Sequence, residues 1–400
     1  MSIRKSIAST WDLAKSGGTS GVLLLAQPLI NLIFSRQRSL DAYSAVDASA
    51  LVFILYAIIC FIVAFRTIEN HRFLVKILFC SPLVLFVLYT AYGTLSMFWS
   101  VNLMLTGFRS FECLSMLMLI VASIGTLIES YGIKRAFQWS MLFVVSNILF
   151  SIISRLMWTT DIFVILEGSQ MMATCFFYLA LFWVPLRWYN YLIMLFSFFS
   201  GSTVAYIGMA LGSISILWTR GKYRFYAVFA ALTVVLLVCY IGPMKVLKET
   251  VFYDKKEISI EQTSGRNHIM DVAIKAIETK PQGWGFFSGE PYLLYKNNLG
   301  AINGHNSLFS AAIGTGLPGV ILICAFLIAM GLAAFSQYIP SRYKAIIIGC
   351  FCVAFMHCMG NPSIGSRVYG AWMPEAYIFS LICAVCTSNK YYILSENEED

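Results

Sequence analysis

The chain alternates between long apolar runs and short polar segments over most of its 400 residues. A helix needs about 20 apolar residues to cross the roughly 30 Å of hydrocarbon in a bilayer. Windows of that length predict spans at 18–35, 45–65, 73–95, 111–129, 136–154, 169–186, 190–200, 203–218, 225–243, 316–335, 343–358 and 371–387. The pattern therefore predicts an all-α polytopic membrane protein with about twelve transmembrane helices.

The run at 190–200 is too short to span a bilayer alone, which leaves two interpretations. Either 190–200 and 203–218 are separate segments divided at the Ser-Gly-Ser sequence of 200–202, or 188–218 is one long tilted helix interrupted there. The distribution of Lys and Arg favours the break, because only the extra segment keeps the basic loops on one side.

Composition and charge agree with this class. Hydrophobic residues make up 59% of the chain, against roughly 45–50% in soluble domains. An N-terminus inside places these basic residues in the cytoplasm: Arg4, Lys5, Lys15, Arg66, Arg72, Lys134, Arg135, Arg187, Arg220, Lys222, Arg224, Arg342, Lys344 and Lys390. The opposite short loops hold Arg36, Arg38, Arg109, Arg155 and Arg367. We therefore expect both termini to be cytoplasmic. The net charge of +8 is explained by basic residues that face anionic lipid headgroups, so we expect no nucleic-acid partner.

All eleven cysteines fall in or at the ends of apolar runs, which argues against a disulfide framework. Cys383-x-x-Cys386 has the spacing of half a zinc site, but no second pair or nearby histidine completes it. We interpret these cysteines as core residues and expect no metal site.

One long extramembrane segment, 244–304, divides the chain, and the topology places it outside. About nine helices precede it in 1–243 and about three follow in 305–390, with an acidic cytoplasmic tail at 391–400. Within the loop, apolar residues at helical spacing predict an amphipathic helix near 265–280, which Pro281 ends. The apolar positions are Ile269, Val272, Ala273, Ala276 and Ile277.

Arg266 falls in the first turn of this predicted helix, after an N-cap at Thr263 or Ser264. A cation is unfavourable there because the helix dipole is positive at that end. The placement favours an anionic partner such as a phosphate, and a surface ion pair with Glu261 or Asp271 is the alternative.

Several stretches together resemble the O-antigen ligase and polymerase superfamily of bacterial inner-membrane proteins. The specific part is SGR at 264–266, KPQGWGFFSG at 280–289 and HNSLFSAAIGTGLPG at 305–319. LSMFWSVN at 95–102 and FSGSTVAYIGMALG at 199–212 are similar to two further elements of these proteins. The resemblance therefore extends over most of the chain.

The resemblance implies a glycosyltransferase of GT-C architecture on the periplasmic face of the inner membrane, without metal or other cofactor. Its donor would be an oligosaccharide on undecaprenyl diphosphate, and transfer would invert the anomeric configuration. The partners implied are this lipid-linked donor, membrane lipid and a chain-length co-polymerase.

On this resemblance, His305 is expected to orient or deprotonate the acceptor hydroxyl, since imidazole titrates near neutral pH. Arg266 is expected to bind the diphosphate through its fork of donors. Asn306 is expected to fix the imidazole or contact the donor. The alternative is structural, with His305 at a helix start and Asn306 as the N-cap. Of the other histidines, we expect His357 to be a core residue or to line the cavity.

The chain departs from the family pattern at Thr203, where many members have an arginine that is taken to contact the diphosphate. Arg109 and Arg367 fall on the outer side and are candidates to supply the missing charge. The alternative for both is an interfacial arginine that extends to the headgroups.

Three functions stay open. Thr203 and the polar loop at 361–370 favour a polysaccharide polymerase for O-antigen, capsule or exopolysaccharide. An O-antigen ligase, which transfers to lipid A-core, is the alternative within the superfamily. A lipid-linked glycan flippase or other transporter is the alternative of another class, although we find no internal repeat of the kind that transporters show.

Overall fold

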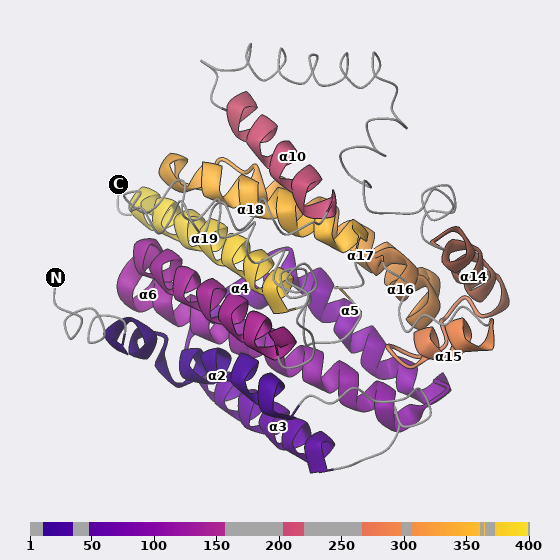
Figure 1. Ribbon diagram of the computed structural model, residues 1–400. Helices are drawn as coiled ribbons and strands as arrows, with labels where there is room; N and C mark the ends of the chain where they lie inside the picture. Colours follow the sequence, from indigo (N-terminus) through magenta and orange to yellow (C-terminus); the bar gives the residue numbers. More distant parts are fainter. Residues whose placement is uncertain are drawn as a thin grey trace.

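The computed structural model describes residues 11–34, 48–156, 203–219, 266–297, 306–360, 364 and 373–398 (Figure 1). Every regular element in these ranges is a helix, which confirms the all-α class for them. The predicted spans at 169–186, 190–200 and 225–243, and the predicted break at 200–202, lie outside the described residues.

The described helices fall into two groups along the sequence. The first group is α2 (Gly18–Phe34), α3 (Ala48–Glu69), α4 (Arg72–Phe79), α5 (Leu83–Leu95), the 3-10 helix η2 (Ser96–Trp99) and α6 (Leu103–Leu156). The second is α10 (Thr203–Thr219), α14 (Arg266–Thr279), α15 (Gly289–Lys296), α16 (Ser307–Gly314), α17 (Gly316–Ala334), α18 (Ser341–Gly360) and α19 (Met373–Glu398). Because α19 continues to Glu398, most of the segment expected as a tail continues a helix.

Helix α6 folds back on itself at Gly132, where φ is 78° and ψ is 169°. A straight helix of its 54 residues would be about 80 Å long, more than twice the hydrocarbon thickness. Residues from both halves meet at Gly21, where an added Cβ would lie 3.2 Å from Ser123 Oγ and 3.1 Å from Trp139 Cζ2. The two halves, visible in Figure 1, contain the predicted spans at 111–129 and 136–154.

The run predicted as one continuous helix at 73–95 is broken, which corrects that prediction. The axes of α4 and of the helix that starts at Leu83 differ by 74°. Pro82 lacks a backbone N–H and cannot continue α4. Ser81 stabilises the break, because its Oγ donates to Ile77 O (2.5 Å) and accepts from Leu83 N (3.2 Å).

Four described helical segments are long and apolar enough to cross a membrane, or five if α4 and α5 form one bent span. They are Ala50–Glu69, Leu103–Phe150, Gly316–Ala334 and Tyr343–Gly360. This agrees with a membrane protein, while the count of about twelve spans stays a prediction.

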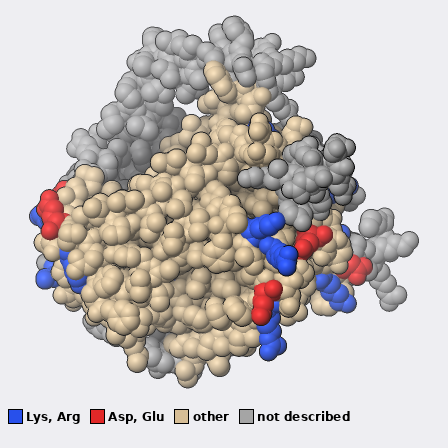
Figure 2. All heavy atoms as spheres, turned by 180° about the vertical axis from the view of Figure 1, so that it is seen from behind, with Lys and Arg blue, Asp and Glu red and all other residues tan. Residues whose placement is uncertain are grey.

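Charged side chains gather toward two ends of the described bundle. On the face that Figure 2 shows, one group of charged side chains lies at the left edge and a second group lies right of centre, with tan surface between them. At one edge His71 Nδ1 lies 2.7 Å from Glu129 Oε2. At the other, Val101 N donates to Trp284 O (3.1 Å). About 40 Å of α6 separates Leu103 from Glu129. We call the end that contains 96–102, 281–289 and 306–317 the site end.

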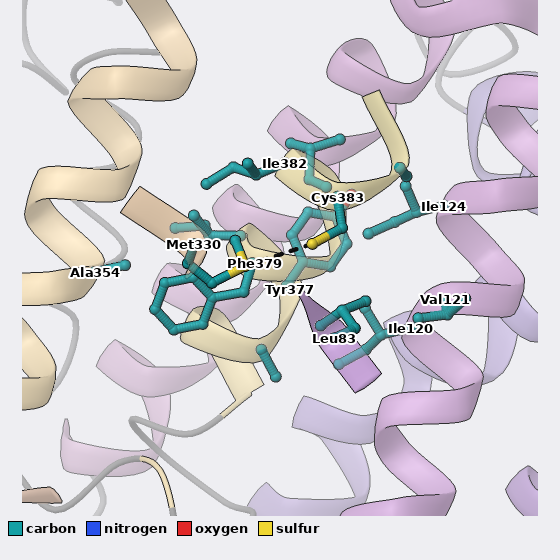
Figure 3. Packing of buried hydrophobic residues seen from close by; sticks show 14 of the residues in the cluster. Leu83, Ile120, Val121, Ile124, Met330, Ala354, Tyr377, Phe379, Ile382 and Cys383 are labelled. Atoms are coloured by element: carbon teal, nitrogen blue, oxygen red, sulfur yellow. Dashed lines mark hydrogen bonds between the residues drawn. The ribbon is translucent and has the colours of Figure 1, made fainter. Parts of the chain in front are cut away.

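The core lies between the ends and joins both parts of the sequence. Figure 3 shows Met330 of α17, Cys383 and Phe379 of α19, and Leu83 of α5 packed together. Cys383 is fully buried, with its Sγ 3.4 Å from Met330 Sδ, so one half of the Cys-x-x-Cys pair packs in this core.

Candidate active site

A glycine turn at 281–289 forms the centre of the site end. Gly283 and Gly285 have φ values of 87° and 110°, which L side chains rarely adopt. A Cβ on Gly283 would lie 2.5 Å from Gly314 O, and one on Gly285 would overlap Ser100 Oγ. Only glycine therefore allows the turn to approach both neighbouring segments.

The turn is hydrogen-bonded to the junction between α16 and α17. Trp284 N donates to Ile313 O (3.0 Å) and Gly285 N to Gly314 O (2.9 Å). Leu317 N donates to Pro281 O (2.9 Å). Two of the sequence stretches that carry the resemblance, 280–289 and 305–319, therefore meet along their backbones.

The stretch at 95–102 covers the other side of the turn. Phe286 N donates to Ser96 Oγ (2.9 Å), and Trp99 Nε1 donates to Gln282 O (3.2 Å). Lys280 Nζ donates to Trp99 O (2.6 Å). This element lies about 180 residues before the turn, and no local sequence pattern indicates the contact.

Three hydroxyl groups stabilise the contact between the stretch at 95–102 and the glycine turn. Ser100 Oγ, Thr106 Oγ1 and Ser288 Oγ lie 2.7 Å from one another in each pair. Thr106 Oγ1 also donates to Phe286 O (3.0 Å). The hydroxyls satisfy one another away from water, so they fix the position of the turn without presenting an open polar site.

Helices α14 and α16 pack together beside the turn. Ile269, Ala273 and Ala276 of α14 belong to one buried cluster with Ala312 and Ile313 of α16. The C-terminal ends of both helices meet at the glycine turn, through Trp284 Nε1 to Ala276 O (3.4 Å) and Trp284 N to Ile313 O. The glycine turn therefore joins the C-terminal ends of both helices.

Asn306 is the N-cap of α16, an eight-residue helix that precedes the membrane helix α17. Its Oδ1 accepts from Leu308 N (2.7 Å) and Phe309 N (3.4 Å). Its Nδ2 donates to Met359 O at the end of α18 (2.8 Å). The structural role weighed for Asn306 is therefore present, and its amide group ties two helices together.

Arg109 lies inside α6 and points toward the glycine turn. Its guanidinium carbon is 5.0 Å from the centre of the Phe287 ring and 5.3 Å from that of Phe108. Its Nη1 donates to Glu112 Oε2 (2.7 Å), and the two side chains are 19% and 0% exposed. The arginine side chain is therefore mostly buried beside the glycine turn.

The other predicted site residues cannot be placed by their side chains. His305 and Arg367 lie outside the described residues. Thr203 and Arg266 begin α10 and α14, and only their backbone is described. Position 203 belongs to a helix that packs on α18, where a Cβ on Gly208 would lie 2.9 Å from Val353 Cα. Among the predicted set, the structure thus brings Arg109 and Asn306 to the site end.

A family model described as O-antigen ligase matches residues 188–324. Over this segment the chain is similar to the O-antigen ligase family, which supports the resemblance to the O-antigen ligase/polymerase superfamily. The matched segment covers about a third of the chain and contains α10, α14, α15, α16 and the first part of α17. A comparison with curated proteins found no match.

The family match includes only part of the site end. The glycine turn and α16 lie inside the O-antigen ligase match, whereas 95–102 and Arg109 lie outside it. These last two nevertheless contact the matched segment through Trp284 and Phe287. The N-terminal helices therefore contribute directly to the site end.

Sequence reasoning missed three buried carboxylates at the site end, Glu112, Glu290 and Glu375. Glu290 Oε1 accepts from Ser310 Oγ (2.5 Å), which ties α15 to α16. Glu375 Oε1 lies 2.6 Å from His357 Nδ1. A signal was available for Glu112 and Glu375, because each falls inside or at the edge of an apolar run, where charged residues are rare.

Proposed function

We propose that this chain is a polysaccharide polymerase that transfers a glycan from undecaprenyl diphosphate to a sugar hydroxyl of a second lipid-linked acceptor. The reaction takes place at the outer face of the bacterial inner membrane, with both termini in the cytoplasm. The observation that carries the proposal is the junction of α14, the glycine turn and α16 inside the O-antigen ligase match. This junction joins the helix that Arg266 begins to the helix that Asn306 caps.

The chemistry requires few groups, because the C1–O bond to a diphosphate is already activated. The protein has to hold the leaving diphosphate and bring the acceptor hydroxyl in line with that bond. Arg266 holds the diphosphate, since a guanidinium stays charged and binds phosphate oxygens in pairs. His305 accepts the proton of the acceptor hydroxyl as the new bond forms. A single displacement without covalent intermediate inverts the anomeric carbon and needs no metal.

Arg109 supplies a second positive charge in place of the arginine absent at Thr203. Its support comes from the site end itself, where its guanidinium packs on Phe287 next to the glycine turn. The pair with Glu112 is formed through Nη1 and holds the guanidinium beside the glycine turn. Arg367 is a second candidate from the last outer loop. Asn306 acts indirectly in this proposal, by fixing the start of α16.

The junction also favours a transferase over a flippase. A flippase has no need of a short helix and an amphipathic helix fixed together outside the membrane spans, whereas a transferase needs such rigid supports for its reacting groups. Ligase and polymerase differ only in the acceptor. The acceptor assignment rests on Thr203 and on the polar loop at 361–370.

The test is transfer by the purified full-length protein in liposomes, with undecaprenyl-diphosphate-linked repeat units as the only glycan and with EDTA present. We expect products of two or more repeats and free undecaprenyl diphosphate. Elongation only when lipid A-core is supplied would favour the ligase. Movement of the lipid-linked glycan between leaflets without any new glycosidic bond would contradict the transferase.

A further inference from the structure

His357 of α18 and Glu375 of α19 form a buried pair near the site end. The imidazole Nδ1 lies 2.6 Å from the carboxylate Oε1, and the side chains are 9% and 0% exposed. Ionisable side chains inside a membrane bundle cost free energy unless they are paired, and they commonly belong to functional sites. Neither residue is part of the proposed reaction described above.

The pair is connected to the start of α16 through the last turn of α18. Met359 follows His357 by two residues, and its carbonyl accepts from Asn306 Nδ2 (2.8 Å). A second contact runs parallel to the first, because Ile364 N donates to Ser307 Oγ (3.2 Å). The end of α18 and Ile364 therefore contact the first two residues at the start of α16, Asn306 and Ser307.

The last turn of a helix needs external contacts because its carbonyl groups have no partner within the helix. Asn306 Nδ2 supplies such a contact to the Met359 carbonyl, and Glu375 anchors the same turn from a different helix by binding the side chain of His357. A shift of this turn would move the Met359 carbonyl away from Asn306. The adjacent residue on the other side of Asn306 is His305, the proposed proton acceptor.

We propose that Glu375 and His357 are positioning residues for glycosyl transfer. They hold the end of α18 so that Met359 fixes Asn306, the cap of α16, which directly follows the proposed proton acceptor in the sequence. The inference rests on the proposed function for the identity of the reaction. It adds a dependence on two helices outside the matched range of 188–324.

The chain offers a matched control at the opposite end of the bundle. His71 Nδ1 and Glu129 Oε2 are 2.7 Å apart, with side chains 36% and 40% exposed. Glu129→Ala therefore removes a similar pair that has no connection to α16. Glu375→Gln is the conservative variant, because its amide oxygen can still accept a hydrogen bond from an Nδ1–H.

Two measurements on the full-length protein test the proposal. The first is hydrogen exchange of the peptide that carries the Leu308 and Phe309 amides, which Asn306 binds. The second is the kcat for elongation of undecaprenyl-diphosphate-linked repeats. For Glu375→Ala we expect faster exchange and a kcat about 100-fold lower with little change in KM, because small misplacements of a catalytic group have effects of this size. Glu375→Gln should restore both, and Glu129→Ala should match the wild type.

Unchanged exchange in Glu375→Ala would overturn the proposal, and so would faster exchange with the wild-type kcat, which would make the pair only structural. If Glu375→Ala does not fold, His357→Asn and His357→Ala give the same comparison, because asparagine can place a donor near the position of Nδ1. A wild type that forms no glycosidic bond would instead contradict the proposed function, and this outcome is seen before any variant is compared.

Discussion

At the residue scale, the site end depends on side chains that are unusually small or fully paired. The glycine turn has no room for a Cβ at Gly283 or Gly285. The hydroxyls of Ser100, Thr106 and Ser288 satisfy one another behind it. This arrangement gives the glycine turn a rigid support.

The glycine turn gives a prediction for Gly285→Ala. The substitution adds a clash with Ser100 Oγ to the cost of a positive φ, and we expect a loss of about 3 kcal/mol of stability. Gly18→Ala is the control, because Gly18 also has a positive φ (62°) but open space around a Cβ. It should cost only about 1 kcal/mol. Thermal unfolding midpoints in detergent measure both, and equal shifts would contradict the clash.

Arg109→Lys tests the second phosphate contact without leaving the buried Glu112 carboxylate unpaired. Lysine keeps the charge but lacks the planar fork that packs on Phe287. We expect kcat/KM for the lipid-linked donor to fall about 10- to 100-fold, which corresponds to roughly 1.4 to 2.7 kcal/mol of transition-state stabilisation. Arg72→Lys, at the opposite end, should have no effect. Wild-type kinetics in Arg109→Lys would remove this arginine from the site.

At the element scale, the site end contains the short helices α15 and α16, whereas the core is built mainly from long helices. α16 has eight residues and depends on its cap and on its neighbours α14 and α17, because helices this short are not stable alone. The membrane helix does not begin directly after the expected histidine and asparagine. A break at Thr315 and Gly316, where φ of Gly316 is 65°, separates α16 from α17.

Asn306 variants distinguish the N-cap role in α16 from a direct contact with the lipid-linked glycan donor. Asn306→Ser keeps an acceptor for the α16 amides and loses the hydrogen bond to Met359 O. Asn306→Ala loses both, and we expect about 1 kcal/mol less stability than Asn306→Ser. Thermal midpoints measure the cap, and the KM for the donor measures a contact. Equal midpoints for the two variants would argue against the cap, and a raised KM in stable Asn306→Ser would indicate direct contact with the donor.

Element positions were largely predictable where a single apolar run decides them. The buried face of α14 follows the spacing of Ile269, Val272, Ala273 and Ala276, and its end follows Pro281. The break before α5 also had a signal in Pro82, which outweighs the apolar character of the run. The contact between 95–102 and the glycine turn was not predictable, because hydrogen bonds across about 180 residues leave no period in the sequence.

At the scale of the whole molecule, the two polar ends define a direction across the membrane. The site end contains the glycine turn, and the opposite end contains the His71–Glu129 pair and the turn at Gly132. The positive-inside distribution predicts that the opposite end is cytoplasmic.

Reporter fusions test this orientation. Alkaline phosphatase fused after Asn297 should be active, because the enzyme folds outside the cytoplasm, and a fusion after Gly132 should be inactive. Green fluorescent protein at the same positions should give the reverse result. Activity on the same side for both positions would contradict the separation of the ends, and exchanged sides would contradict the orientation.

We propose above that this protein extends polysaccharide chains through His305 and Arg266. The most direct measurement is complementation of two strains, one without the polymerase of the cognate cluster and one without the ligase, read as polysaccharide ladders on a gel. We predict that the wild type restores long chains in the polymerase strain only. His305→Ala and Arg266→Ala, expressed at the wild-type level, should leave single repeats, whereas His71→Ala and His268→Ala should restore the ladder. Full activity of His305→Ala would contradict the account.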